Sequence, residues 1–285
     1  MSVAPPRAPG GGQADRTPSS VRVNPPADLA LFSRTLMPAA ATYCLRLGDD
    51  SLVLCQRLGE WSTRAPELEE DVALTNIALD LLGQARALLS HVAELEGRGR
   101  DEDALAFRRD DREFLNCQMV ERPNGDFAET MARLLLFSAH QHQLYAALAA
   151  STDPVIAAIA ERALKEVAYH RDHASLWTLR LGDGTEESHR RMQAGLEAVW
   201  PFSAELFESD PLTVEVAACG VGVDPPALLP GWESYVNAVI TEATLTVPQP
   251  GWFPSGGRRG LHTESFGYLL AEMQHLHRSH PEAQW

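Results

Sequence analysis

The stretch that decides the fold is "PELEEDVALTNIALDLLGQARALLSHVAELE", residues 66–96. Its apolar residues recur at spacings of three and four, which is the period of one buried helix face. Pro66 suits a first helical turn, and the acidic residues after it complement the positive end of the helix dipole. The pattern therefore predicts one long helix over residues 66–96.

Further helices are predicted on both sides of this stretch. Helical periodicity starts near Tyr43 and returns over residues 127–150 and 154–181, which the turn "STDP" separates. Two helical hairpins joined by one long crossover, residues 97–126, make a four-helix bundle. Additional C-terminal helices are predicted over three shorter ranges: 188–207, 232–245 and 264–278. No stretch favours a strand, so the predicted fold class is all-α.

The N-terminal part has a different composition. Residues 1–40 are rich in Pro, Gly, Ala and Ser, and such a segment cannot bury enough apolar surface to offset the entropy of ordering. We expect a disordered tail over residues 1–40 and one helical domain over residues 41–285.

The bulk composition excludes several classes of protein. The chain has 39 acidic and 24 basic residues, a formal charge of -15, which disfavours nucleic acid or an anionic membrane as the main partner. The four cysteines form no CxxC pair and are typical of free thiols in a reducing compartment. Neither a membrane span nor a secretory signal is evident. We expect a cytoplasmic protein with no nucleic-acid or membrane partner.

The chain also contains patterns that bear on metal binding. A di-iron bundle needs a carboxylate from each of two helices and Glu-x-x-His from each of the other two. Two literal matches exist, Glu186 with His189 and Glu272 with His275. Neither opens a long bundle helix, and a four-residue match arises easily by chance. We expect both pairs at the surface.

The suitable positions are the middles of the bundle helices. A shift of 86 residues brings the second helix of one hairpin onto that of the other, so that "LLGQ" matches "VAYH" with an aliphatic residue in place of each glutamate. The positions that correspond to metal ligands are Ser51, Leu81, Gln84, Ser138, Val167 and His170. One imidazole does not hold iron against water. The repeat therefore predicts a degenerate site without a metal and no catalytic residue in this chain.

Polar residues line the two helices near these positions. Asn76, Asp80 and Gln84 follow one another at spacings of four, and Glu166 and His170 do the same on the partner helix. We predict that Asn76, Asp80 and Glu166 belong to a hydrogen-bonded network that fills the bundle centre. The alternative is a degenerate site that retains acid-base capacity.

Several long motifs carry a resemblance to a known family. They are "YCLRLGDDSLVLCQRLGEWSTRAPELEEDVALTNIALDLLGQAR", "FRRDDREFLN", "ERPNGDFAET", "LKEVAYHRDH", "AELF", "TEATLTVP" and "GLHTESFGYLLAEMQHLHR". Over residues 43–285 they closely resemble the family of structural, non-catalytic C subunits of bacterial ring-1,2-phenylacetyl-CoA epoxidases. The segment "WSTRAPEL" is also similar to the catalytic sister subunit of those enzymes.

The resemblance implies a ferritin-like bundle that binds no cofactor and acts as a structural partner of the catalytic sister subunit. That catalytic subunit would carry the di-iron centre, and a separate reductase subunit would supply electrons for the epoxidation of phenylacetyl-CoA in aerobic phenylacetate degradation. Phenylacetyl-CoA could lie at the interface. The candidate substrate or partner contacts are Glu113, Phe114, Leu115, Asn116, Arg258 and Arg259.

Two other functions stay open from the sequence. One is an independent metalloenzyme that uses His170 and Glu166, with Asp80 or His173, in an unconventional site. The other is a stand-alone helical binding scaffold without an oxygenase partner.

Overall fold

The computed structural model describes residues 27–283, together with Met1 and Ala4, and shows side chains within this range from Met37 onward. Its helices, α and 3-10 (η), are α1 (Ala27–Gly59), α2 (Leu68–Glu96), α3 (Glu102–Phe107), η1 (Asp111–Glu113), α4 (Gln118–Glu121), α5 (Phe127–Leu148), α6 (Pro154–Gly182), α7 (Glu186–Val199), η2 (Trp200–Phe207), α8 (Pro211–Ala218), η3 (Pro225–Leu228), α9 (Leu229–Glu242), η4 (Gly257–Arg259) and α10 (Glu264–Ser279). The described residues contain no strand, so the predicted all-α class is confirmed.

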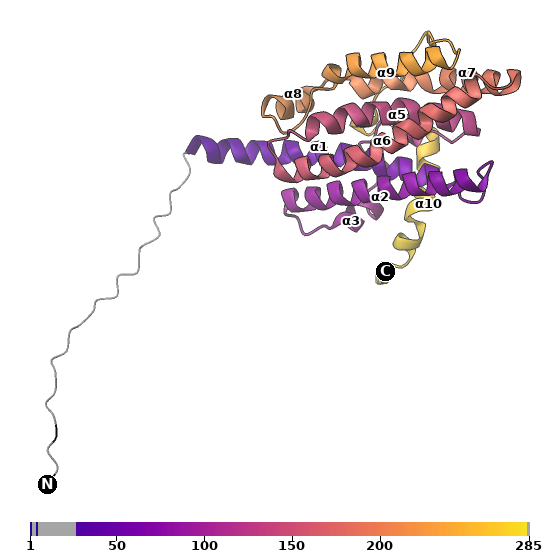
Figure 1. Cartoon of the computed structure of the whole chain (residues 1–285). Coiled ribbons are helices and arrows are strands. Elements are labelled where there is room, and N and C mark those ends of the chain that lie inside the picture. Colours follow the sequence, from indigo (N-terminus) through magenta and orange to yellow (C-terminus); the bar gives the residue numbers. More distant parts are fainter. Residues whose placement is uncertain (2–3, 5–26, 284–285) are drawn as a thin grey trace.

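The four longest helices form the predicted bundle. α1 packs along α2, α5 packs along α6, and α2 and α6 bring the two hairpins together. Figure 1 shows these helices running lengthwise beside one another. The crossover between the hairpins contains α3, η1 and α4. The architecture is that of a ferritin-like bundle, as the sequence predicts.

Local sequence signals set the ends of these helices. Asp126 caps α5 by accepting the Glu129 N–H, and Asp153 caps α6, whose first residue is Pro154. Gly97 ends α2 with a φ of 61°, a conformation that glycine adopts at low cost. The predicted start of α2 at Pro66 is two residues early, because the structure makes Glu67 the N-cap.

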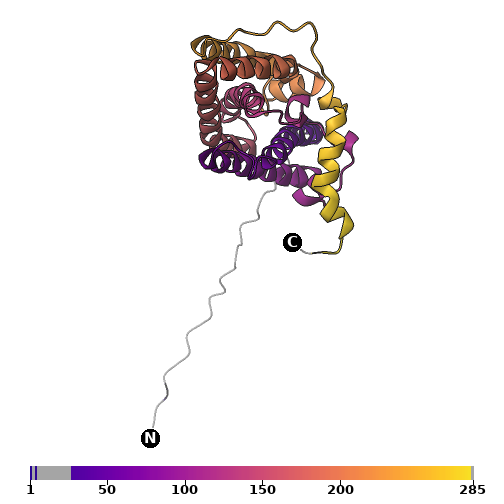
Figure 2. The same cartoon turned by 90° about the vertical axis from the view of Figure 1, so that its right-hand side faces the viewer.

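The C-terminal helices cover the bundle from two sides. α7 and α9 pack on α5 and α6, whereas α10 contacts α1, α3, α4 and η1. Figures 1 and 2 both show α10 crossing the bundle at a steep angle. One cluster of buried hydrophobic side chains includes residues of the four bundle helices, α7, α9 and α10. The added helices therefore share the core of the bundle.

The N-terminal boundary differs from the prediction. α1 begins at Ala27, and Ala39 and Ala40 are buried in the core. The predicted tail boundary at residue 40 therefore lies inside a helix, because alanine suits both a helix and a low-complexity segment. The rest of the predicted tail, residues 2–3 and 5–26, lies outside the described residues.

α2 is long and apolar enough to cross a membrane by length and composition alone. In this structure it lies along α1, and 44% of its apolar window is buried within the chain. A core helix of a bundle has the same composition. The remaining exposed apolar surface of α2 bears on the function proposed below.

Candidate functional site

The six positions that correspond to metal ligands all lie inside the bundle. Each is at most 3% exposed: Ser51 on α1, Leu81 and Gln84 on α2, Ser138 on α5, Val167 and His170 on α6. We call these six residues the bundle centre. All six residues therefore lie on the interior faces of four helices.

The two serines of the bundle centre offer little to a metal. The Ser138 hydroxyl donates to the carbonyl oxygen of Leu134 on its own helix. The Ser51 hydroxyl is buried and has no hydrogen-bond partner among the described residues. A hydroxyl is a much weaker iron ligand than a carboxylate, and these are the positions where a di-iron bundle needs carboxylates.

Polar contacts follow the seam between α2 and α6. Tyr145 donates to Oε1 of Gln84 at 3.2 Å, and Nε2 of Gln84 donates to Oε2 of Glu166 at 3.1 Å. Nε2 of His170 lies 3.0 Å from Oδ2 of Asp80. The predicted network thus exists in part.

Its position, however, differs from the prediction. Asn76 is exposed and makes no side-chain hydrogen bond within the described part of the chain, and the side chain of Asp80 is 36% exposed. Glu166 also reaches the surface, where it pairs with Arg162. The network therefore runs from Gln84 and His170 in the bundle centre out to the rim of the seam, because the i, i+4 stripe of Asn76, Asp80 and Gln84 turns outward along α2.

These residues do not fit a di-iron centre. Leu81 and Val167 stand where bridging carboxylates belong, and His170 is the only imidazole of the bundle centre. Burial lowers the pKa of His170, and the hydrogen bond with Asp80 opposes this only in part. In the part of the chain with described side chains, no group of three or more His, Cys, Asp or Glu residues is arranged to hold a metal ion.

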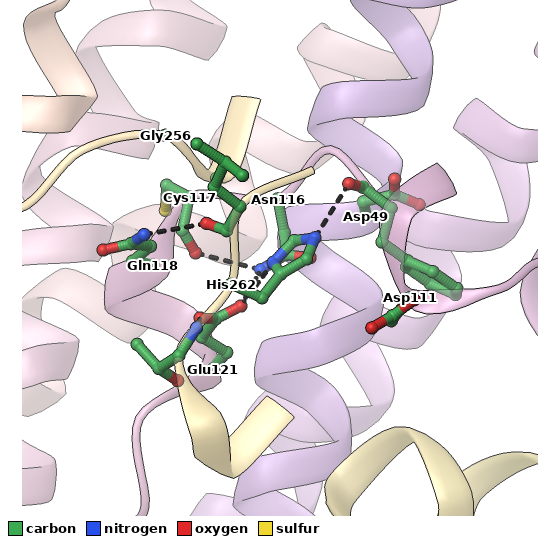
Figure 3. Close-up of polar contacts among 12 residues, drawn as sticks. Asp49, Asp111, Asn116, Cys117, Gln118, Glu121, Gly256 and His262 are labelled. Carbon is green, nitrogen blue, oxygen red and sulfur yellow. Dashed lines mark hydrogen bonds and ion pairs between the residues drawn. The ribbon is translucent and has the colours of Figure 1, made fainter. Parts of the chain in front are cut away.

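A second polar region lies beside the bundle, where α1 meets the crossover and the segment before α10. It contains Asp49, Asp50, Arg109, Asn116, Glu121, Glu205, Arg258 and His262, and we call it the loop cluster. Figure 3 shows part of it, with the loop residues Asn116 and His262 beside Asp49 of α1. Each of its carboxylates is engaged by the protein itself.

The two acidic residues of α1 each bind an arginine and a loop backbone. Arg109 binds both oxygens of Asp49, which also accepts the Leu115 N–H at 2.8 Å. Arg258 binds Asp50 in a fork, with Nη2 2.8 Å from Oδ2, and Asp50 also accepts a backbone N–H. Burial raises the pKa of Asp50, and the Arg258 charge opposes that rise. These ion pairs attach distant loops to α1.

Glu121 and His262 form the next part of the loop cluster. Nδ1 of His262 lies 2.8 Å from Oε2 of Glu121, and Nε2 lies 3.0 Å from the carbonyl oxygen of Phe114. Both partners are acceptors, so both ring nitrogens carry protons. Burial alone would lower the pKa of His262, but the Glu121 bond and charge raise it above its ordinary value. The two acceptors and the raised pKa both favour the protonated form of His262.

Glu205 anchors the glycine-rich segment before α10. Its carboxylate accepts the backbone N–H groups of Gln118, Gly256 and Gly257 at 2.7 to 2.9 Å. Gly256 has a φ of 125°, and a Cβ on Gly257 would lie 2.2 Å from the carbonyl oxygen of Asn116. The segment "SGGRRG" therefore needs its glycines to approach the crossover closely.

The structure gives packing roles to most of the candidate contact residues. Glu113 caps η1 by accepting the Asp110 N–H, and Phe114 is buried beneath the Arg109 guanidinium, 4.0 Å from its ring centroid. Arg258 donates to the carbonyl oxygen of Leu115 at 3.1 Å. The two predicted regions thus meet, a contact that no sequence spacing reveals.

The last two candidates differ sharply in exposure. Asn116 is fully buried and donates to Glu121 at 3.0 Å, while its Oδ1 has no partner within the described residues. Arg259 is exposed, and no hydrogen bond of its side chain is found in the described part of the chain. Of the six candidates, Arg259 alone presents a free cationic group to an external ligand.

Comparison with known proteins follows from these motifs and this fold. A family model described as "Phenylacetic acid catabolic protein" matches residues 33–285. The chain belongs to this family. The C subunit of 1,2-phenylacetyl-CoA epoxidase from Escherichia coli (strain K12) is 51% identical to it over 249 residues, which cover 87% of this chain and all of the relative. The resemblance found in the sequence is confirmed.

In this phenylacetic acid catabolic protein, the two literal Glu-x-x-His matches do not belong to a metal site within the described residues. Glu186 lies in the first turn of α7, and His189 contacts the carbonyl oxygen of Gly182 at the end of α6. Glu272 and His275 are exposed on α10. Both pairs are surface features, as the sequence predicts.

The ion pairs of the loop cluster, in contrast, are not predicted by the sequence of this phenylacetic acid catabolic protein. One signal was present, because "LGDDSL" places two adjacent acidic residues inside an apolar helix. Buried carboxylates need partners, so Asp49 and Asp50 imply buried cations elsewhere in the chain. The sequence does not say which arginines these are.

Proposed function

We propose that this chain is the structural, metal-free subunit of a multicomponent phenylacetyl-CoA epoxidase, a cytoplasmic hetero-oligomer of aerobic phenylacetate degradation. In this proposal the catalytic sister subunit carries the di-iron centre and a reductase subunit supplies electrons. The observation that carries the proposal is the bundle centre. Serine and aliphatic residues occupy its four carboxylate positions in a fold whose catalytic members need carboxylates there.

The loop cluster supports a structural role. Its buried ion pairs hold α1, the crossover and the segment before α10 in one arrangement. A rigid bundle of this kind can stabilise a partner bundle by packing against it, and so fix the orientation of the metal ligands in that partner. The chain would contribute to the reaction without touching the reacting atoms.

The outer face of α2 supports the presence of a partner. Val72 and Leu79 are 53% and 58% exposed, and no charged residue lies between Asp71 and Asp80. An uncharged apolar strip with charged residues at both ends is the usual anatomy of a protein interface. The acidic residues that open α2 disfavour an anionic membrane on this face. We assign the strip to contact with the catalytic subunit.

Metal analysis tests the metal-free role. The chain is purified alone and after co-expression with its catalytic partner, and iron content and molecular mass are measured on both samples. We expect stoichiometric iron only in the mixed complex. Stoichiometric iron on the isolated chain, lost in His170→Ala, would overturn the proposal and favour an independent metalloenzyme.

A matched pair of variants tests the partner surface. Leu79→Asp on α2 and Val214→Asp on α8 place a carboxylate at residues of similar exposure, 58% and 54%. We expect Leu79→Asp to abolish co-elution with the catalytic subunit and Val214→Asp to preserve it. The opposite result would move the interface away from α2, and a monomer indifferent to that subunit would favour a stand-alone scaffold.

A further inference from the structure

A cavity of about 300 Å³ lies where α1 and α5 meet η2, α8, η3 and η4. Ligand pockets in proteins start at about this volume, and a cavity of roughly 150 Å³ already holds a benzene ring. Leu47 is one helical turn before Ser51, and His140 is two residues after Ser138. The α1 part of the lining therefore lies on the same helix face as Ser51.

The inner wall of the cavity is apolar. It is formed by the buried side chains of Leu47, Leu144, Leu206 and Leu228. His140 adds the edge of a buried imidazole, and burial lowers its pKa to about 3, with the Arg258 charge acting in the same direction. His140 is therefore neutral at physiological pH. The inner part of the cavity suits an uncharged ring or a branched hydrocarbon group.

The charged groups of the lining fall into two kinds. Most are already paired. Arg46 binds Asp210 at 2.6 Å, Arg258 binds Asp50, and Glu205 accepts three backbone N–H groups.

The remaining two charged groups of the lining lie at the mouth. Glu208 accepts a hydrogen bond from Ser255 at 2.6 Å, and Arg259 is exposed without a side-chain partner in the described residues. Arg259 is thus the one cation of the lining without a partner among the described residues. A guanidinium binds a carboxylate with two parallel hydrogen bonds.

We infer that this cavity binds a small monocarboxylic acid with a compact apolar body, its carboxylate on Arg259 at the mouth and its body against the leucine wall. A body of one ring matches the volume. A dianionic phosphate fits less well, because Glu208 in the same lining repels a doubly charged group about twice as strongly as a singly charged one. The inference does not depend on the non-catalytic role proposed above.

Such a ligand would act on the fold through its contacts. It would touch α1 through Leu47, α5 through Leu144 and the segment before α10 through Arg259. Because it binds the folded chain only, it would also raise thermal stability. The site therefore offers this chain a way to sense a free acid, separately from the catalysis of its partner.

Calorimetry on the full-length chain tests the inference, with phenylacetate as the acid and 2-phenylacetamide as its neutral isostere. We expect phenylacetate to bind at one site and the amide to bind at least about tenfold more weakly, because the amide loses the charged contact. Arg259→Gln should reduce phenylacetate binding by about tenfold and leave amide binding unchanged. Arg98→Gln, which changes another exposed arginine, should leave both unchanged.

A plugged variant distinguishes the cavity from the surface around Arg259. Val223→Trp fills the cavity from a half-buried wall position and should abolish binding of both probes. The melting temperature of the ligand-free variant should equal that of the parent, which shows that the variant folds. Absence of phenylacetate binding to the parent chain would overturn the inference. Equal binding to the parent, Arg259→Gln and Val223→Trp would do the same.

Discussion

The bundle centre and the loop cluster both lie largely beneath the surface, yet their chemistry is opposite. The bundle centre has one ionisable side chain among its six residues, whereas the loop cluster has seven among its eight. In a di-iron bundle the centre would hold the carboxylates. In this chain the buried carboxylates hold arginines, a histidine and loop backbones instead. The same fold can therefore use buried charge either for metal chemistry or for attaching its own loops.

The largest effect is expected from a substitution that disrupts the loop cluster. Arg109→Met removes the partner of Asp49 and leaves a buried, uncompensated carboxylate, which should lower the free energy of unfolding by about 3–5 kcal/mol. Urea denaturation of the isolated chain measures this loss. The control is Arg190→Met, which removes an exposed pair with Glu187 and should leave the midpoint unchanged. Equal midpoints for Arg109→Met and the parent would contradict a structural role of the loop cluster.

A similar but smaller effect is expected in the bundle centre, for a different reason. Leu81→Ala leaves a cavity among buried helices and should cost about 2–5 kcal/mol of unfolding free energy. Leu81→Met, which nearly conserves volume, should cost less than about 1.5 kcal/mol. Denaturation curves for the two variants test whether Leu81, which the sequence predicts to stand at a degenerate ligand position, acts by packing. If adding iron stabilised Leu81→Glu, this position could still contribute to metal binding, which would contradict a role in packing alone.

The smallest expected effect is the dependence of stability on pH. Its sign should differ between the bundle centre and the loop cluster. The pKa of His170 is lowered in the fold, so its contribution to stability is present above its ordinary pKa of about 6.5 and is lost as the pH falls through the folded value. The pKa of His262 is raised, so its contribution is present below about 6.5 and is lost as the pH rises through the folded value.

Variants of the two histidines measure this difference. We compare the unfolding free energies of His170→Gln and His262→Gln with the parent between pH 5 and 8, values that bracket the ordinary histidine pKa of about 6.5. The stability gap to the parent should shrink toward low pH for His170→Gln and toward high pH for His262→Gln, by at most about 1.4 kcal/mol per pH unit. Gaps that change in the same direction would contradict the assigned protonation states.

Much of the fold could be predicted from local patterns. The limits of α5 and α6 follow from Asp126, Asp153 and Pro154, because capping is a property of a few adjacent residues. The bundle centre could also be predicted, since two equivalent hairpins place residues 86 positions apart at equivalent depth. The start of α1 could not, because its alanine-rich first turns resemble the composition of the tail.

Arg258 and Asn76 show where prediction from the sequence failed. Arg258 was considered as a contact for an external anion, and the structure pairs it with Asp50, 208 residues away along the chain. Asn76 was placed in a core network and is exposed, because a stripe at spacings of four drifts around a helix that has 3.6 residues per turn. The pairing of Arg258 with Asp50 is not visible in sequence spacing, whereas the exposure of Asn76 follows from the helical period.

The sequence by itself determined the all-α class, the two hairpins and the family, and it predicts a bundle centre without carboxylates. These depend on residue identity and short-range period, which the printed chain contains. Only the tertiary structure decided which buried acids meet which arginines, where the polar seam reaches the surface, and that Arg259 stands alone at the mouth of a cavity. Those features arise from contacts between residues far apart in the chain. The packing of the helices decides which of these residues meet.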